Sequence, residues 1–203
     1  MINTALAFLT NELNQYLKLR TGTPEVERVF LTSVATESNG IVIPDKSLGI
    51  SLINIEEDRV FKEQRTSVIN QEGNVEYRNP EIKLNLYVLI SANFQDKVEN
   101  DSSDDYVEGL KQLSFIISYF QAKNVFTPDN SPALAAIDPN INKLVVELYS
   151  YSFEQLYNFW SVVGTKYLPS VLYKIKLVTF QESEFFDSGK PIEKIGINSE
   201  TKQ

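Results

Sequence analysis

Ile82-Lys83-Leu84-Asn85-Leu86-Tyr87-Val88-Leu89-Ile90 is the strongest strand signal in the chain, and the other elements can be placed around it. Its first half alternates apolar and polar residues, which is typical of a strand with one buried face. Its second half is apolar on both faces, as in a central strand that is covered on both sides. The stretch therefore predicts a central strand of a β-sheet.

A helix and several strands are predicted before this strand. Apolar residues recur at helical spacing over residues 2–19, and Gly22 followed by Pro24 ends that pattern. Strand-like stretches follow at residues 29–34, 48–55 and 60–69, and residues 71–74 look like a hairpin turn or loop. We therefore expect one core-packing helix and then a group of strands.

Helices and strands alternate after residue 90. Apolar residues at helical spacing follow Asp105 and Glu108, a pair that resembles a capping box. Residues 127–140 contain three prolines, so we expect an irregular loop whose length points to function. Strands are predicted at 144–150 and 171–180. Between them, Ser152 and Gln155 open a short helix that carries Trp160 on its apolar side and ends at Gly164.

The order of these elements predicts an α+β fold. Strands cluster early and helices are interspersed later, which indicates a mixed, largely antiparallel β-sheet flanked by helices. The core-like pattern stops after Glu182. We therefore expect a single domain over residues 1–182 and an extended C-terminal tail over residues 183–203.

The composition excludes most catalytic chemistry. The 203 residues include no histidine and no cysteine, which removes Ser-His-Asp and Cys-His catalysis, disulfides and thiol ligands. The eight glycines are isolated, so no phosphate-binding glycine loop can be built from them. A net charge of −8 argues against a nucleic-acid binder and a polybasic membrane-surface protein. The first residues do not resemble a secretory signal, and no apolar run approaches the roughly 18 residues of a membrane span.

Acidic side chains are the remaining candidates for chemistry. They include Glu56, Glu57, Asp58, Glu147 and the acids of the 96–105 loop. Nothing places two of them across a cleft, and the spacing of Asp101, Asp104 and Asp105 matches no calcium loop. We interpret them as solvated or helix-capping charges and predict no catalytic, metal-binding or cofactor-binding residue, no cofactor and no enzymatic activity. A carboxylate-dependent hydrolase is the enzymatic alternative.

Three stretches, taken in order, carry a resemblance to a known family. They are residues 79–92 (NPEIKLNLYVLISA), residues 106–121 (YVEGLKQLSFIISYFQ) continuing to Val125-Phe126, and residues 156–160 (LYNFW) followed by 167–176 (YLPSVLYKIK). Together they resemble the tail-terminator, or cap, proteins of extracellular contractile injection systems, the phage-tail-like particles of the antifeeding-prophage and virulence-cassette type. The resemblance runs from Met1 to about Phe180.

The resemblance implies a structural protein. Such a cap is a homohexameric ring that closes the distal end of an inner tube and a contractile sheath. The expected partners are therefore the tube protein and the sheath protein, with no nucleic acid and no membrane span. We expect assembly in the bacterial cytoplasm, within a particle that is released from or anchored in the cell. A baseplate or adaptor subunit of the same kind of particle is the alternative.

A cap of this kind should offer an open sheet edge, because sheath subunits exchange extended arms with their neighbours. The predicted strand at 171–180 and the tail beyond it are the candidates for that edge. The candidate contact residues are Val171, Tyr173, Lys174, Ile175, Lys176, Leu177 and Phe180. Lys174 and Lys176 would keep a free edge from pairing with itself. An ordinary sheet strand without a partner protein is the alternative interpretation.

Overall fold

The computed structural model describes residues 1–36, 40–58, 67–69, 75–77, 82–94, 102–179 and 188–189. The helices are α1 (Ile2–Thr21), α2 (Ser102–Ala122), α3 (Pro132–Ile137) and α4 (Phe153–Val163). The strands of the main sheet are β1 (Val29–Leu31), β2 (Ser47–Glu57), β5 (Ile82–Asn93), β6 (Val125–Phe126), β7 (Ile141–Tyr149) and β8 (Ser170–Thr179). Three short strands form a second sheet: β3 (Ser67–Ile69), β4 (Val75–Tyr77) and β9 (Ser188–Gly189).

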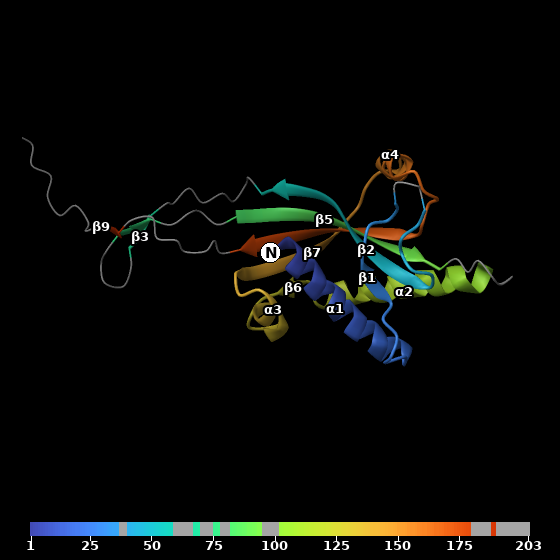
Figure 1. Ribbon diagram of the computed structural model, residues 1–203, viewed down its shortest axis with the longest axis horizontal. Coiled ribbons are helices and arrows are strands. Elements are labelled where there is room, and N and C mark those ends of the chain that lie inside the picture. The colour runs from blue at the N-terminus through green and yellow to red at the C-terminus, as the bar shows by residue number, and fades with distance from the viewer. Residues whose placement is uncertain are drawn as a thin grey trace, which may run out of the picture.

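The main sheet has six strands in the order β1-β2-β5-β8-β7-β6 (Figure 1). All of its neighbouring strands are antiparallel except β1 and β2, which are parallel. β5 lies between β2 and β8, so the central strand predicted at residues 82–90 is confirmed. The predicted α+β fold with a mixed, largely antiparallel sheet and flanking helices is also confirmed.

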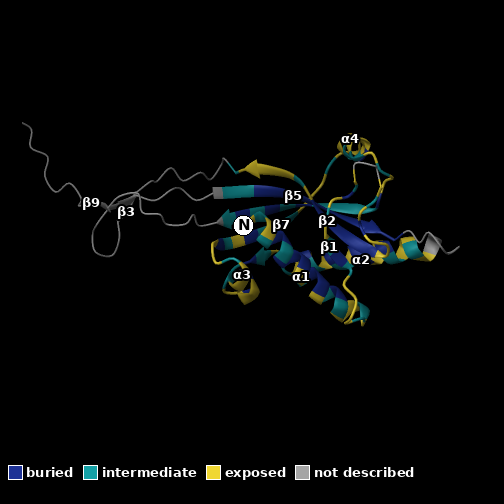
Figure 2. Cartoon of the chain, in the orientation of Figure 1, coloured by how far each residue is buried: buried dark blue, intermediate teal, exposed yellow. Residues whose placement is uncertain are grey.

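Helices cover the two faces of this sheet unequally. In Figure 1, α1, α2 and α3 lie on one side of the sheet and α4 lies on the other. We call the side under α1 and α2 the closed face, and the side under α4 the second face. The closed face holds a continuous core, coloured dark blue in Figure 2, whose largest fully buried side chains include Phe8, Leu9, Leu13, Leu17, Leu86, Ile116, Phe126, Leu134 and Ile141. The second face holds a smaller cluster of Val34, Ile43, Leu89, Trp160 and Leu168.

Helix-capping chemistry explains where α1 and α4 end. Gly22 and Gly164 follow the two helices in the left-handed region, with φ of 67° and 70°, which glycine adopts without a steric penalty. Ser152 and Gln155 form both hydrogen bonds of the predicted capping box at the start of α4. Trp160 is buried, as its position on the apolar side of the helix predicted.

Two predictions about local structure are wrong. α2 begins at Ser102, so Asp105 lies inside its first turn and not at its cap; its carboxylate lies 3.7 Å from Lys46 Nζ. The proline-rich segment 127–140 is not wholly irregular, because it contains α3. Pro132 is the first residue of this helix, where a missing N–H costs no hydrogen bond.

Several predictions fall partly outside the described residues. Most of the strand predicted at 60–69 and the turn at 71–74 lie there, although β3 and β4 pair with each other in antiparallel register. Ser188 and Gly189, from the predicted tail, pair with Glu76 and Val75 of β4. The boundary between a domain at 1–182 and a tail at 183–203 stays a prediction.

Candidate assembly surfaces

β8 carries the predicted contact residues, and it is an internal strand. It pairs with β5 from Ser170 to Thr179 and with β7 from Leu172 to Thr179. Because its backbone is paired on both sides, it offers no free edge to another strand. The prediction that this strand forms an open edge is therefore wrong.

The side chains of the predicted contact residues are divided between the two faces. Tyr173, Ile175 and Leu177 are buried in the core of the closed face, and Val171 is half-buried against it. Lys174 and Lys176 alternate with them and therefore lie on the second face. Lys176 Nζ lies 2.9 Å from Glu147 Oε1 on β7, and Phe180 lies outside the described residues. A contact role for these side chains stays a prediction.

The outer edge of β1 is closed by a side chain of α1. Asn14 Nδ2 donates to the carbonyl of Val29 at 2.8 Å. Its Oδ1 accepts from the backbone N–H groups of Val29 and Arg28, at 2.9 and 3.0 Å. Sequence reasoning missed this residue, although a signal existed: Asn14 is a polar residue on the buried stripe that also holds Thr10 and Leu17.

β2 continues well beyond its short neighbour β1. β1 pairs only with Leu48, Gly49 and Ile50, whereas β2 runs to Glu57. In the part of the chain that the structure describes, no strand pairs with the outer side of residues 52–56. Ile50 accepts a hydrogen bond from the Thr32 N–H on this side, so strand alternation turns the N–H and C=O of Leu52 outward as well. This outer side of residues 52–56 is called the β2 edge below.

The β2 edge carries apolar and acidic groups. Leu52 and Ile55 are 37% and 46% exposed, and a register shift between Leu52 and Asn54 bends the strand there. Glu56 is held in place, because its carboxylate accepts from Asn54 Nδ2 at 3.2 Å and from the Tyr87 hydroxyl at 3.0 Å. Burial, followed by the bond to Glu56, raises the pKa of Tyr87. The edge thus presents a fixed carboxylate beside backbone groups that pair with no other strand among the described residues.

α4 carries exposed apolar side chains as well as buried ones. Phe153 is 91% exposed and Tyr157 is 73% exposed, one helical turn apart. They border an open hollow of about 490 Å³ whose other walls are Leu156, Trp160, Ser161, Gly164, Thr165 and Tyr167. Contiguous exposed apolar side chains of this kind mark protein-interaction surfaces. We call this the α4 surface.

A tyrosine cluster extends the α4 surface toward α2. Burial raises the pKa of Tyr167, and the nearby hydroxyls of Tyr151 and Tyr106 add to the shift. Tyr106 belongs to α2 and is half exposed, so the two helices contribute to one aromatic region. Tyrosine combines apolar area with a polar tip, which suits an interface that is exposed before assembly.

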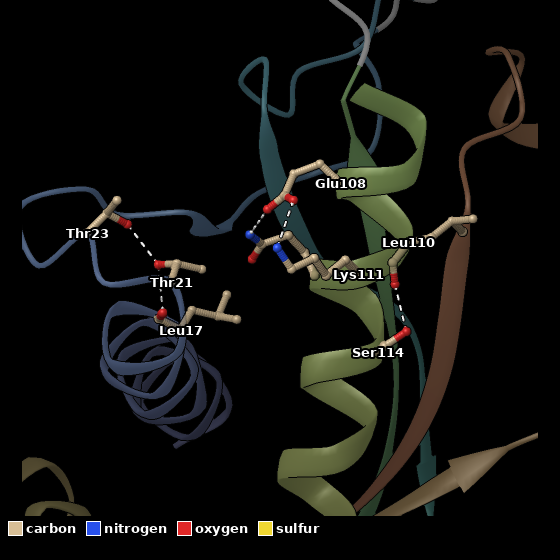
Figure 3. Close-up of polar contacts among 8 residues, drawn as sticks. Leu17, Thr21, Thr23, Glu108, Leu110, Lys111 and Ser114 are labelled. Atoms are coloured by element: carbon tan, nitrogen blue, oxygen red, sulfur yellow. Dashed lines mark hydrogen bonds and ion pairs between the residues drawn. The ribbon is translucent and has the colours of Figure 1, made fainter. Parts of the chain in front are cut away.

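Polar side chains along α2 are largely satisfied within their own helix (Figure 3). Glu108 accepts from Gln112 Nε2 at 2.8 Å and from Lys111 Nζ at 3.4 Å, and the Ser114 hydroxyl donates to the carbonyl of Leu110 at 2.8 Å. Thr21 donates in the same way to the carbonyl of Leu17 at the end of α1. The exposed Leu110 and Ser114 therefore add a weakly polar strip beside the tyrosine cluster.

No catalytic arrangement emerges among the described residues. The α4 hollow and a smaller cavity of about 180 Å³ beneath α4, bordered by Ile53, Leu89 and Phe159, have no carboxylate in their walls. Within the described ranges, no three acidic side chains come together as ligands for a metal ion. Asp104 and Asp105 lie in the first turn of α2, and Asp101 lies outside the described residues. Among the helices described, none combines the length and apolar composition that crossing a membrane requires.

Comparisons with known proteins give one family and one fold. The family model of the Pvc16 N-terminal domain matches residues 4–194. No curated protein matches the chain. Two solved structures share the fold, both determined by cryo-electron microscopy. One is the PVC sheath/tube terminator of an extracellular contractile injection system in its extended state, with 16% identity and a TM-score of 0.58. The other is the tube-terminating cap of the anti-feeding prophage, with 12% identity and a TM-score of 0.57.

The two matches cover nearly all of this chain but only part of the other proteins. The first covers 100% of this chain and 64% of the terminator, and the second covers 94% of this chain and 60% of the cap. At these identities the similarity shows a shared fold.

Proposed function

Because the chain belongs to the Pvc16 N-terminal domain family, we propose that it is a structural cap that ends the tube and sheath of a contractile injection system. The family match over residues 4–194 carries this proposal. The fold shared with a sheath/tube terminator and a tube-terminating cap supports it. The role is structural and not enzymatic, in keeping with a chain that has neither histidine nor cysteine.

The proposed assembly is a homohexameric ring that contacts the tube protein and the sheath protein. A closed ring needs two different surfaces on each copy, joined head to tail. The aromatic α4 surface supports a role in such contacts, because its exposed Phe153 and Tyr157 are costly to leave in water. Assembly takes place in the bacterial cytoplasm, within a particle that is released from or anchored in the cell.

The β2 edge replaces β8 as the proposed place for an extended arm of the sheath protein. An added strand would pair with the outward N–H and C=O of Leu52, in the manner of strand addition to a sheet edge. Its side chains would pack on the exposed Leu52 and Ile55 of one face, and a basic residue would complement the fixed carboxylate of Glu56 on the other.

Electron microscopy of particles that lack this chain tests the cap role. We expect tubes of uncontrolled length with no terminal ring, and recovery of uniform length when the chain is supplied again. A gold-labelled chain should lie at the end distal to the baseplate. Particles of normal length without the chain, or label at the baseplate, would contradict the cap proposal; the second outcome would favour an adaptor or baseplate subunit.

Two substitutions at one position test the sheath contact separately. Leu52→Pro removes the outward N–H that an added strand needs, while the bonds between β2 and β5 remain. Leu52→Ala removes the same side chain and keeps the N–H, so it is the matched control. We expect capped tubes with a detached sheath for Leu52→Pro and an anchored sheath for Leu52→Ala. Equal behaviour of the two folded variants would exclude strand addition at the β2 edge.

A further inference from the structure

We propose that Asn14 is a positioning residue that holds β1 against the first part of β2 and so sets the point at which a strand added to the β2 edge must stop. β1 has only three residues and is the sole parallel strand of the main sheet as described. Such a short strand has little pairing of its own to keep it in place. Where β1 ends therefore decides how much of β2 a partner can reach.

The parallel register turns one residue of β1 toward Asn14. The Leu48 N–H donates to the carbonyl of Arg28 at 2.7 Å, and the Thr32 N–H donates to the carbonyl of Ile50 at 3.0 Å. In a parallel ladder the alternate residues of β1 then face away from β2, so the N–H and C=O of Val29 point outward.

The carboxamide of Asn14 does what a neighbouring strand would do for Val29. It supplies one donor and one acceptor to the outward C=O and N–H, at 2.8 and 2.9 Å. Asn14 is itself 7% exposed, between the fully buried Leu13 and Leu17 of α1, so its side chain is fixed by the core. The three bonds of this buried amide tie β1 and Arg28 to α1, in addition to the ladder that ties β1 to β2.

Loss of this attachment would lengthen the accessible edge of β2. With β1 in place, the described edge begins at Leu52. The outward backbone groups of Leu48 and Ile50 are then already paired with β1 and the residues that flank it. With β1 detached, the outward groups of Leu48 and Ile50 would join those of Leu52, and an added strand could pair in more than one register. Asn14 thus acts on the specificity of strand addition through β1, without touching the partner.

Amide hydrogen exchange on the purified full chain, read residue by residue by NMR, tests the inference. In Asn14→Ala we expect the amides of Leu48 and Thr32 to exchange faster by about tenfold or more, because three bonds that hold β1 are gone. The amide of Ser51, which faces β5 in the alternation, should keep its protection. Asn14→Asp should also accelerate these two amides at neutral pH, because a carboxylate cannot donate to the carbonyl of Val29, but less than Asn14→Ala, because it can still accept from the N–H groups of Val29 and Arg28.

A matched control separates this role from ordinary destabilisation. Leu134→Ala removes a fully buried side chain of α3, the helix that follows β6 at the opposite edge of the main sheet from β1, and should leave the contrast between Leu48 and Ser51 unchanged. Unchanged exchange at Leu48 and Thr32 in Asn14→Ala would overturn the inference. The same local acceleration in Leu134→Ala would overturn it too. The effect of Asn14 on strand addition rests on the proposed sheath contact at the β2 edge, but these exchange outcomes do not depend on the cap proposal, which the particle experiments test.

Discussion

On the closed face of the main sheet, buried side chains from three helices and all six strands form one continuous cluster, whereas the second face buries only a small group beneath α4. Beyond this group the second face is mixed: it carries the ring contact between Tyr87 and Tyr149 and the ion pair between Lys176 and Glu147. α4 itself presents Phe153 and Tyr157 to solvent. Glu154, Asn158 and Ser161 form a polar stripe on α4, so these two exposed aromatic side chains lie outside both that stripe and the buried cluster. We therefore expect the closed face to supply most of the stability, whereas α4 on the second face leaves apolar side chains exposed.

Truncating a leucine on each face of β5 is the strongest test of this difference. Leu86 is fully buried on the closed face, and Leu89 is 1% exposed on the second face but borders the cavity of about 180 Å³. We expect Leu86→Ala to lower the free energy of unfolding by about 4 kcal/mol and Leu89→Ala by about 2 kcal/mol, because Leu89 already has fewer neighbours to lose. Urea unfolding measures both. Equal losses would remove the difference in stability between the faces.

Asp138 gives the closed face a pH dependence. Burial raises its pKa, but bonds from Thr4 and the Asn140 N–H, with the α-ammonium of Met1, outweigh burial and leave the pKa below 3.8. A carboxyl with a lowered folded pKa adds stability above its unfolded value, near 3.8, and loses it as the pH falls through the folded value. We expect Asp138→Asn to cost about 1.5 kcal/mol at pH 7 and nothing at pH values below the folded pKa.

Urea unfolding at several pH values measures this effect. Asp129→Asn, at an exposed position of the same connection, is the control and should change little at any pH. A loss for Asp138→Asn that persists undiminished in acid would assign the effect to packing and not to charge.

The smallest expected change in the free energy of unfolding is that of Tyr173→Phe. Its hydroxyl is buried in the closed-face core without a hydrogen-bond partner among the described residues, and burial raises its pKa to about 12. Tyr173→Phe should therefore raise the free energy of unfolding by about 1 kcal/mol, or the melting temperature by about 2–4 °C. Tyr119→Phe is the matched control and should lower it, because the Tyr119 hydroxyl donates to Glu12 at 2.8 Å. A loss in both variants would mean that the Tyr173 hydroxyl has a partner.

Periodicity predicted those elements whose pattern is local. The apolar stripe of α1, the alternation of β5 and the capping box of α4 each involve residues of a single helix or strand, so the sequence is sufficient to find them. The capping box predicted at Asp105 and Glu108 was wrong, because acidic residues are also favoured within the first turn of a helix, and α2 begins three residues before Asp105.

Strand order and side-chain partners were beyond such patterns. Lys174 and Lys176 make one face of β8 polar. A polar face occurs both in edge strands and in central strands of a sheet with one partly uncovered face, so this pattern could not tell the two apart. Asn14 bonds to the backbone N–H and C=O of a residue fifteen positions away. Because every residue has these groups, the sequence does not show which of them a side chain will bind. Both cases, the open edge predicted for β8 and the missed role of Asn14 beside β1, depend on which element lies next to a strand, and the local sequence pattern does not contain that information.

The place of β8 between β5 and β7 also has a consequence for synthesis. β5 leaves the ribosome about 80 residues before β8, its partner on one side, which corresponds to several seconds at roughly 5–20 residues per second. During that time β5 has one edge unpaired, and β7 can pair only with the two residues of β6. The main sheet is thus completed only when residues 170–179 arrive, and a nascent chain stalled before them is the form most exposed to aggregation.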